Sequence, residues 1–469
     1  MNKEAMKNSN YFTALNYERM IREYPMGDDY INLMTTISRD ELRDLQERRF
    51  VHLMKRGWEI PFYRRLWSKE GMEPGDITAL EQSVSVPSYS KSDLMQSIEE
   101  HPPFGDFHGM DTFAHGERPP VVFHTTSGTT GTPQNLFFGP WSRELQNVML
   151  ARAYHIQGIG PDDVVHSVYG HGMINGGHYV RETFVHYSPA LYLSAGTGNE
   201  TRSVQQVQNM ARFGVTVLVG FADYIVKLAQ VANDEGLIPG KDIPVRMIVG
   251  HMGRESRTAI SDAWGGAEIY DLYGVGDTGI VAFEGPDREG MYVHEDAHLL
   301  ELTGPDDGAA VPYGEQGNMV ITVLFKDDIY PVIRFDTKDV TAFDERSSSV
   351  GYGFRRITGF LGRSDNMVKI RGINLYPIAV GAIANEHPSA TGEYICRVER
   401  DPMGRDEMIV RIEVQDPADS NVRDQIAAEL KLRLGIAIEV EIVRIGATAD
   451  LTQVEKRQKA IRLVDNRFV

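Results

Sequence analysis

The chain is short of cysteine and of basic residues, and each shortage excludes a class of protein. Cys396 is the single cysteine among 469 residues, so neither an intrachain disulfide nor a cysteine-based zinc site can form. We expect Cys396 to be a small buried apolar residue. The 48 basic and 66 acidic residues give a formal net charge of −18, which repels phosphate backbones and argues against nucleic-acid binding.

Long apolar runs are also missing. The N-terminal sequence MNKEAMKNSNYF lacks the apolar stretch of a signal peptide, and no run reaches the roughly 18 apolar residues of a membrane span. We therefore expect a cytoplasmic protein with no membrane partner. A chain of this length, 42% of it hydrophobic, exceeds one ordinary core, which predicts a large domain and at least one smaller one.

The pattern of apolar residues predicts an α/β fold. Residues 39–70 are amphipathic and helical, and their aromatic, basic end IPFYRRLW is expected to pack rather than to bind a partner. From about residue 160, apolar strands alternate with helical segments: VVHSVYG, VTVLVG and VRMIVG alternate with VQQVQNMARFG and DYIVKLAQVANDEG. This alternation predicts parallel sheets with helices on their faces, and residues 290–344 predict a β-rich subdomain. We place a large N-terminal domain at 1–361 and a small α+β domain at 362–469.

A loop rich in glycine and hydroxyl side chains follows the strand-like run VVFHTT. It reads TTSGTTGTP from Thr125 to Pro133. Glycines let main-chain N–H groups approach an anion, and hydroxyls add short donors. A solvated turn is the less favoured alternative. The kinase-type pattern GxxxxGK[ST] is absent, and Gln134 stands where related loops commonly carry lysine. The predicted phosphate-binding residues are Thr126, Ser127, Gly128, Thr129, Thr130 and Gly131.

This loop resembles the phosphate-binding motif of the acyl-adenylate-forming superfamily, which includes acyl-CoA synthetases. The whole chain most resembles the phenylacetate–coenzyme A ligase family. The resemblance implies an acid–thiol ligase that uses ATP, Mg²⁺ and coenzyme A and forms an acyl-AMP intermediate. It also implies that the small C-terminal domain is mobile and that the protein is a homodimer. The acid would be an aryl acid or a small hydroxylated acid of the 2-hydroxyacyl type.

Two further stretches resemble the family's nucleotide motifs. In DLYGVGD, Tyr273 would stack on adenine, Asp271 would bond its amino group, and Asp277 stands where the family has a Glu that helps to hold Mg²⁺. Asp277 would bind the metal directly or through water; otherwise it is a turn residue. In FDTKD, Asp339 would accept hydrogen bonds from ribose, while Asp336 replaces the usual Arg, for which Arg334 is a candidate substitute.

The last two motifs lie in the small domain. GRSDNMVKIRG, residues 362–372, resembles the interdomain hinge, with Asp365 as the pivot and Arg363 reaching the nucleotide. The alternative is an ordinary surface loop. Arg371 and Gly372 would contact coenzyme A. KRQKAIRLVD near the C-terminus resembles the family's final motif, which aligns Lys459 with the catalytic lysine; Lys456 and Arg457 are nearby alternatives.

A glycine-rich segment, VYGHGMINGGH at 168–178, corresponds to the family's substrate wall. Together with neighbouring positions it supplies the predicted pocket residues Tyr169, His171, Gly172, Gly176, His251 and Gly274. Several histidines could suggest a metal, but their spacing fits no standard zinc pattern, and wall or core roles are favoured. The polar wall favours a smaller or hydroxylated acid.

Two other classes of function stay open at this point. One is an adenylate-forming enzyme that passes acyl or AMP groups to an amine, a carrier protein or a cofactor without coenzyme A. The other is a non-catalytic nucleotide-binding protein, suggested by the departures at Asp277, Asp336 and the segment at His251.

Overall fold

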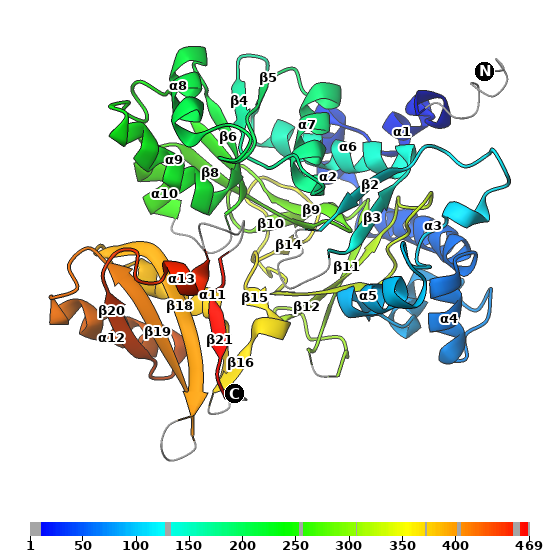
Figure 1. Ribbon diagram of the computed structural model, residues 1–469. Helices are drawn as coiled ribbons and strands as arrows, with labels where there is room; N and C mark the ends of the chain where they lie inside the picture. The colour runs from blue at the N-terminus through cyan, green and yellow to red at the C-terminus, as the bar shows by residue number, and fades with distance from the viewer. Residues whose placement is uncertain are drawn as a thin grey trace. The chain divides into compact units, whose positions relative to one another are not determined.

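The computed structural model describes residues 11–126, 133–252, 257–305, 307–370, 373–400, 405–453 and 460–467 (Figure 1). The chain separates into two compact units. The first contains most of the chain before residue 338 together with Ala342–Gly359, and the second contains Lys338–Thr341 and the chain from Phe360 onward. The two-domain division at residues 361 and 362 remains a prediction. None of the described helices is long and apolar enough to cross a membrane.

The N-terminal part of the first unit is helical. Its helices are α1 (Tyr17–Glu23), α2 (Gly27–Thr36), α3 (Arg39–Trp58), α4 (Pro61–Lys69) and α5 (Lys91–Glu100). A capping box between Ser38 and Glu41 starts α3, and Pro61 at the first position of α4 separates the two helices. The predicted packing of the IPFYRRLW segment is confirmed, because Phe62, Tyr63 and Trp67 are buried.

An eight-stranded sheet forms the centre of the first unit, in the order β14-β10-β9-β8-β7-β6-β4-β5. Its strands are β4 (Val164–Ser167), β5 (Leu191–Ser194), β6 (Val217–Phe221), β7 (Met247–His251), β8 (Glu268–Val275), β9 (Gly279–Glu284), β10 (Met291–Val293) and β14 (Arg356–Ile357). The run from β5 through β8 is parallel, which confirms the βαβ prediction. The connecting helices are α6 (Pro140–Ile156), α7 (Asn175–Tyr187), α8 (Ser203–Phe213), α9 (Ala222–Asp234) and α10 (Arg257–Ala263).

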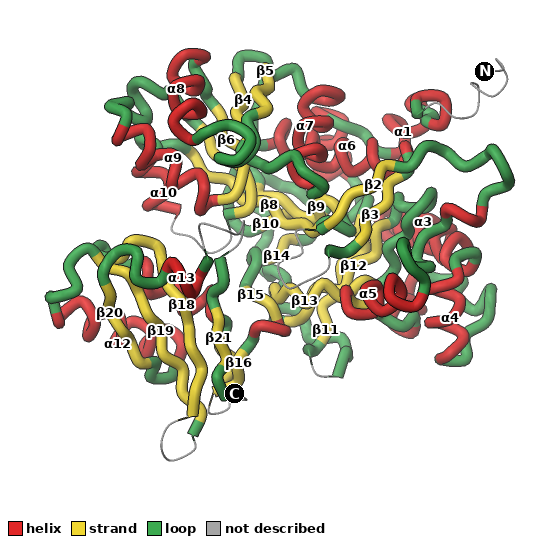
Figure 2. Tube along the Cα trace, viewed as in Figure 1, coloured by secondary structure: helices red, strands yellow, loops and turns green. Residues whose placement is uncertain are grey.

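A second sheet and a hairpin supply the β-rich part, as expected for residues 290–344. The sheet runs β1-β13-β12-β11, and β15 also pairs with β13. The strands are β1 (Tyr89–Ser90), β11 (His298–Thr303), β12 (Gly317–Val323), β13 (Phe335–Thr341) and β15 (Gly362–Arg363). The separate antiparallel hairpin consists of β2 (Val122–Thr125) and β3 (Asn135–Phe138), visible as two adjacent strands in Figure 2. Short 3-10 helices lie at Phe12–Ala14, Leu80–Ser85 and Met110–Thr112.

The second unit has its own sheet and core. The sheet order is β20-β19-β18-β21, with β18 (Ala390–Arg400), β19 (Asp406–Val414), β20 (Glu439–Val443) and β21 (Leu463–Asp465). Helices α11 (Pro377–Asn385), α12 (Ser420–Leu434) and α13 (Ala449–Thr452) and the pair β16 (Val368–Ile370) and β17 (Ile373–Leu375) complete it. Cys396 is fully buried in this core, as expected. The α/β fold class is therefore confirmed.

Candidate active site

The β2–β3 hairpin holds the two ends of the predicted phosphate loop. Thr126 donates its main-chain N–H to the Gln134 carbonyl at 3.0 Å, and the Thr126 hydroxyl accepts from the Gln134 N–H at 3.1 Å. The hairpin is therefore closed directly beneath the loop. Of the predicted phosphate-binding residues, Thr126 is described, whereas Ser127, Gly128, Thr129, Thr130 and Gly131 lie outside the described residues.

The two faces of this hairpin point to different parts of the first unit. Successive side chains of a strand alternate between faces, so Phe123 and Phe137, which are cross-strand partners, share one face. The next pair, His124 and Leu136, belongs to the other face. Leu136 reaches the turn after β8, since a Cβ atom added at Gly276 would lie 2.9 Å from its methyl group. This face therefore points toward the motif that contains Asp277.

Asp277 is the centre of a buried polar group in that turn. Its Oδ1 accepts hydrogen bonds from Gln134 Nε2 at 2.5 Å and from the Tyr330 hydroxyl at 2.7 Å. Lys326 Nζ donates to the Asp277 carbonyl oxygen at 2.8 Å. All four side chains are buried. Gln134, noted in the sequence only as a departure from related loops, thus links the phosphate hairpin to Asp277.

Burial sets the ionisation of this group. Loss of solvent raises the pKa of the Asp277 carboxyl, although the Tyr330 hydroxyl, Lys326 and Gln134 oppose that shift. Burial likewise lowers the pKa of Lys326 to about 8, opposed by Asp277 and Asp328. A buried carboxylate whose orientation is fixed by two neutral donors is a hard oxygen ligand, and a divalent cation beside it would favour its charged form. The residues at this position therefore fit a Mg²⁺ site.

The adenine-motif residues Asp271 and Tyr273 are both buried on β8. Asp271 Oδ1 accepts from the main-chain N–H groups of Met252 and Leu272, each at 2.9 Å. The Tyr273 hydroxyl lies 3.5 Å from Thr337 Oγ1. Asp271 therefore orders the backbone directly after the carboxyl end of β7, the edge at which parallel sheets bind ligands. Their contacts with adenine stay predictions.

The predicted substrate-wall residues form one tyrosine–histidine pair. The Tyr169 hydroxyl lies 2.8 Å from His251 Nδ1 and donates to the Gly220 carbonyl at 3.3 Å. A Cβ atom at Gly176 would meet the Tyr169 ring at 3.7 Å, so Gly176 lies against the same tyrosine. Gly274 follows Tyr273 on β8 and lies so close to Gly279 that a Cβ atom would be 2.1 Å from its carbonyl oxygen.

A second group of imidazoles lies on α7 and the loop before it. His178 Nε2 is 2.7 Å from the His171 carbonyl and 3.0 Å from that of Gly172, while His171 Nε2 is 2.8 Å from Ser194 Oγ. The His178 ring also stacks on His124, with centroids 4.9 Å apart. Burial, with Arg143 and His178 nearby, lowers the pKa of His124 to about 4, so its imidazole is neutral at physiological pH.

Two members of the Asp277 group, Lys326 and Tyr330, were not anticipated from the sequence. Their signal is a lysine inside an apolar stretch, VLFKDDIY, because a lysine is rarely buried without a partner. Asp336 stands where the family has an arginine, and we expected Arg334 to take over the role of that arginine. This expectation is wrong. The Arg334 guanidinium is buried, bonds Glu301 at 3.0 Å and donates to the carbonyls of Val84 and Val86. Arg334 therefore has a structural role.

Three predicted residues meet in the second unit. Arg363 Nη1 donates to Asp339 Oδ1 at 2.9 Å, while its Nε and Nη2 donate to the two oxygens of Asp365 at 2.8 and 2.6 Å. Asp339 and Arg363 are also register partners in β13 and β15. The predicted ribose, nucleotide and hinge residues thus form one ion-pair group. Arg371, Gly372 and Lys459 lie outside the described residues.

Comparison with known proteins agrees with this arrangement. The family described as AMP-binding enzyme C-terminal domain matches residues 372–467. A phenylacetate-coenzyme A ligase of Thermus thermophilus is 28% identical over 440 residues, covering 88% of this chain and 95% of that protein. A phenylacetate-coenzyme A ligase of Aromatoleum evansii is 27% identical over 449 residues, covering 92% and 96%.

A similar fold is found among solved structures. The 2-hydroxyisobutyryl-CoA ligase in the postadenylation state, in complex with 2-HIB-AMP, matches with a TM-score of 0.80 at 25% identity, covering 93% of this chain and 92% of that one. The same ligase with 2-HIB-AMP and CoA in the thioesterification state matches with a TM-score of 0.65 at 26% identity, with the same coverage.

Proposed function

Because this chain belongs to the acyl-adenylate-forming superfamily and is an acid–thiol ligase, we propose that it joins a carboxylic acid to coenzyme A through an acyl-AMP intermediate. The observation that carries this proposal is the Asp277 group, in which Gln134 connects the phosphate hairpin to a buried carboxylate at 2.5 Å. The similarity to phenylacetate-coenzyme A ligases over about nine-tenths of the chain supports the same assignment.

In the first half-reaction, a carboxylate oxygen attacks the α-phosphate of ATP in line, and pyrophosphate leaves. Thr126 and the loop that follows it, Ser127–Gly131, bind the phosphates with N–H and hydroxyl donors. Asp271 and Tyr273 receive the adenine. Lys459 bridges the acid and the α-phosphate, so that negative charge is neutralised as it develops in the transition state.

Asp277 is the residue we assign to Mg²⁺, either directly or through a water molecule. The metal, when bound, neutralises charge on the phosphates. Gln134 and Tyr330 orient the carboxylate, and Lys326 fixes the main chain of the same residue, so the ligand does not have to be reorganised when ATP binds. Preorganised ligands of this kind favour tight positioning of the phosphates.

In the second half-reaction, the thiol of coenzyme A attacks the acyl carbon, a thioester forms and AMP leaves. We assign Asp339 to the ribose hydroxyls and Arg363 to the nucleotide. Asp365 acts as the hinge that lets the second unit change position between the half-reactions, and Arg371 and Gly372 contact coenzyme A. We also propose that the protein acts as a homodimer, which its mass in solution would test.

The acid is proposed to be an aryl acid or a small 2-hydroxy acid. The aryl class is supported by the relatives that are phenylacetate-coenzyme A ligases, and the hydroxy class by the similarity to 2-hydroxyisobutyryl-CoA ligase. The wall residues Tyr169, His171 and His251 offer polar partners for a hydroxyl group. A site built to bond a hydroxyl rejects the analogue without it by a large factor, so kcat/KM for phenylacetate and 2-hydroxyisobutyrate separates the two classes.

The test is a panel of both acid classes with ATP, Mg²⁺ and coenzyme A, in which pyrophosphate and AMP are measured separately. We expect acid-dependent pyrophosphate release, and AMP release that coenzyme A accelerates. AMP release that coenzyme A does not accelerate would instead indicate an amine, carrier-protein or cofactor acceptor. ATP binding without pyrophosphate exchange for any acid would indicate a non-catalytic protein.

The role of Lys459 is tested by the Lys459→Ala variant. We expect its acid-dependent ATP–pyrophosphate exchange to fall by about 100-fold or more, because a cation that stabilises developing charge is removed. Lys456→Ala is the matched control and should retain exchange. Equal exchange in the Lys459 variant and the wild type would move the catalytic role to another residue.

A further inference from the structure

The first unit carries a groove on the side of the phosphate hairpin that faces away from Asp277. It consists of two adjoining cavities of about 610 and 590 Å³, which share His101, Gly105, His108 and Asp111 as lining residues. We call these two cavities the outer groove. Their size is typical of small-molecule sites, and both are formed by residues between 59 and 137.

One cavity of the outer groove is lined by aromatic rings. The ring centroid of Phe104 lies 6.0 Å from that of Phe123 and 5.9 Å from that of Phe137, and the centroids of Phe123 and Phe137 are 5.4 Å apart. The ring of the buried His108 lies 4.9 Å from Phe137. Phe104 is 44% exposed, so part of this aromatic surface is open to solvent. A cavity lined by aromatic rings in this way favours a flat aromatic ligand, because aromatic rings pack against one another by offset and edge contacts.

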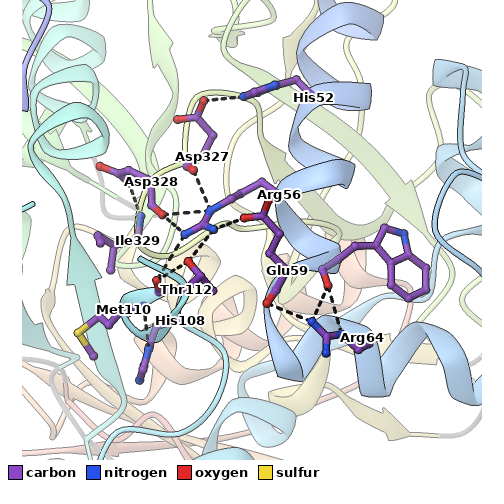
Figure 3. Close-up of polar contacts among 12 residues, drawn as sticks. His52, Arg56, Glu59, Arg64, His108, Met110, Thr112, Asp327, Asp328 and Ile329 are labelled. Carbon is purple, nitrogen blue, oxygen red and sulfur yellow. Dashed lines mark hydrogen bonds and ion pairs between the residues drawn. The ribbon is translucent and has the colours of Figure 1, made fainter. Parts of the chain in front are cut away.

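The charges around the groove favour an anion. Two of its carboxylates are already paired: Glu59 with Arg56, and Asp106 with Arg65. Arg118, which lines the aromatic cavity, has no hydrogen bond or ion pair within the described part of the chain. In the adjoining cavity, Arg64 donates to the carbonyls of Trp58 and Glu59 and to no other group among the described residues (Figure 3).

Asp111 and His101 complete the charges of the groove. Asp111 is an exposed carboxylate, and His101 lies 3.6 Å from the paired Asp106. The two guanidinium groups therefore outnumber the one carboxylate that has no arginine partner. We propose that the outer groove is a second ligand site, which binds a small aromatic carboxylate with its ring among Phe104, Phe123 and Phe137 and its carboxylate on Arg118.

Two parts of the chain hold the donors to Asp277, and a ligand in this groove would contact the first of them, the β2–β3 hairpin. Phe123 and Phe137 belong to the hairpin whose opposite face carries Leu136 against Gly276, and Gln134 immediately precedes β3. The next residue, Asn135, donates from Nδ2 to the carbonyl of Pro103, a lining residue of the groove, at 3.0 Å. If a ligand displaced the hairpin, Gln134 would move, and with it the amide group that donates to Asp277 Oδ1.

The second of these parts is the chain from Asp327 to Tyr330. Arg56 donates to the carbonyls of Asp327 and Asp328, and it also bonds Thr112 and Glu59, which line the groove (Figure 3). The N–H of Gly109 donates to the Ile329 carbonyl at 2.6 Å. Tyr330, whose hydroxyl bonds Asp277, packs its ring 5.3 Å from Phe107. Occupation of the groove is thereby coupled to the adenylation centre.

The binding test uses 2-naphthoate as the probe, titrated calorimetrically into the full-length protein. We expect a site whose affinity falls by about 10-fold or more in Arg118→Ala, because a charge-assisted hydrogen bond is lost, and in Phe104→Ala. Arg118→Lys should recover part of the affinity. Arg212→Ala, an exposed arginine on α8, is the matched control and should bind as the wild type does.

Equal affinity in all four variants, or the absence of any such site in the wild type, would overturn the proposal. The affinity for the uncharged analogue 2-naphthol should be lower than that for 2-naphthoate by a factor of about 10 or more. If 2-naphthol binds as tightly as 2-naphthoate, the assignment of an anionic ligand is wrong. Phe104 and Arg118 are exposed, so we expect both variants to fold, which their melting temperatures verify.

The coupling test measures acid-dependent ATP–pyrophosphate exchange with and without 2-naphthoate. We expect the probe to change the wild-type rate by about 5-fold or more and to leave the Arg118→Ala rate unchanged. An identical response in both proteins would overturn the coupling, since it would indicate competition at the acyl site. This arm rests on the proposed function: a protein that shows no exchange with any acid contradicts that function and leaves the binding titration intact.

Discussion

The two polar groups assigned to the nucleotide are built in opposite ways. Asp277 in the first unit is 3% exposed and bonds two neutral donors, Gln134 and Tyr330. The Arg363 group in the second unit consists of charged partners, with the side chains of Arg363 and Asp365 34% and 48% exposed. A buried carboxylate needs every donor it can reach, whereas an exposed ion pair is stabilised by solvent and contributes little to folding.

This difference matches the two tasks that we propose. A ligand for a metal should not move, and Gln134 and Tyr330, which are far apart in the sequence, both donate to the Oδ1 atom of Asp277. A hinge must exchange its contacts during each cycle, and exposed ion pairs can be broken at low cost. The predictions below test whether the two groups differ in this way.

The largest expected effect is on stability when Asp277 is removed. The Asp277→Ala variant leaves the buried Lys326 without one of the two carboxylates that favour its charge, and leaves Gln134 and Tyr330 without their acceptor. We expect the free energy of unfolding to fall by about 3–5 kcal/mol in urea denaturation. Asp365→Ala is the comparison, with an expected loss below about 1 kcal/mol. Similar losses in both variants would remove the distinction between the groups.

The next effect concerns pH and Lys326. Burial lowers the pKa of Lys326 to about 8, so between about pH 8 and its ordinary pKa near 10.5 the unfolded chain binds more protons at this residue than the folded one. Its contribution to stability therefore rises with pH in this window. The difference in unfolding free energy between the wild type and Lys326→Met should rise by on the order of 1 kcal/mol from about pH 8 to about pH 9.5. A difference that does not vary with pH would contradict the assigned shift.

A hinge variant should separate the two half-reactions. Proline fixes its own φ and restricts the residue before it, so Asp365→Pro should slow thioester formation about 10-fold and leave ATP–pyrophosphate exchange near the wild-type rate. Single-turnover formation of the acyl-CoA product, started from preformed acyl-AMP, measures the second step alone. Asp365→Ala keeps the backbone free and serves as the control. Parallel losses in both steps would place Asp365 in nucleotide binding instead.

The smallest effect is expected for Arg363. Arg363→Ala should lower stability by about 1 kcal/mol, because the pair with Asp365 is exposed whereas the buried Asp339 loses its partner. It should also raise KM for ATP about 10-fold. Arg363→Lys retains the charge but loses the planar guanidinium that bonds Asp365 through two nitrogens. Its KM for ATP should therefore lie between those of the wild type and Arg363→Ala. An unchanged KM in both variants would leave Arg363 with a structural role only.

Strands β4, β6 and β7 of the parallel sheet could be predicted from the sequence, because each belongs to a short apolar run that ends at a glycine. Helix α7 could not, because the glycine-rich segment before and within its first turn suggests a loop. Gly177 is required there by close packing, since a Cβ atom would lie 2.2 Å from the Gly170 carbonyl. A glycine that allows close approach and a glycine that allows flexibility look the same in a sequence.

In the candidate site, too, some residues could be predicted from the sequence and others could not. Asp277, Asp339 and Arg363 were predicted because their motifs follow one another in a familiar order. The partners of Asp277 were not, because Lys326 and Tyr330 lie 49 and 53 residues away and meet it only after the β-rich part has folded. Local pattern identifies a reactive residue more readily than the residues that hold it.

The central claim is that the Asp277 group supports adenylation, and acid-dependent ATP–pyrophosphate exchange by Asp277→Asn tests it most directly. Asparagine keeps the size of the side chain and an acceptor for Tyr330 but removes the charge. We predict an exchange rate lower by about 100-fold or more, with a smaller loss of stability than in Asp277→Ala because the hydrogen bond from Tyr330 is kept. Exchange at the wild-type rate would contradict the account.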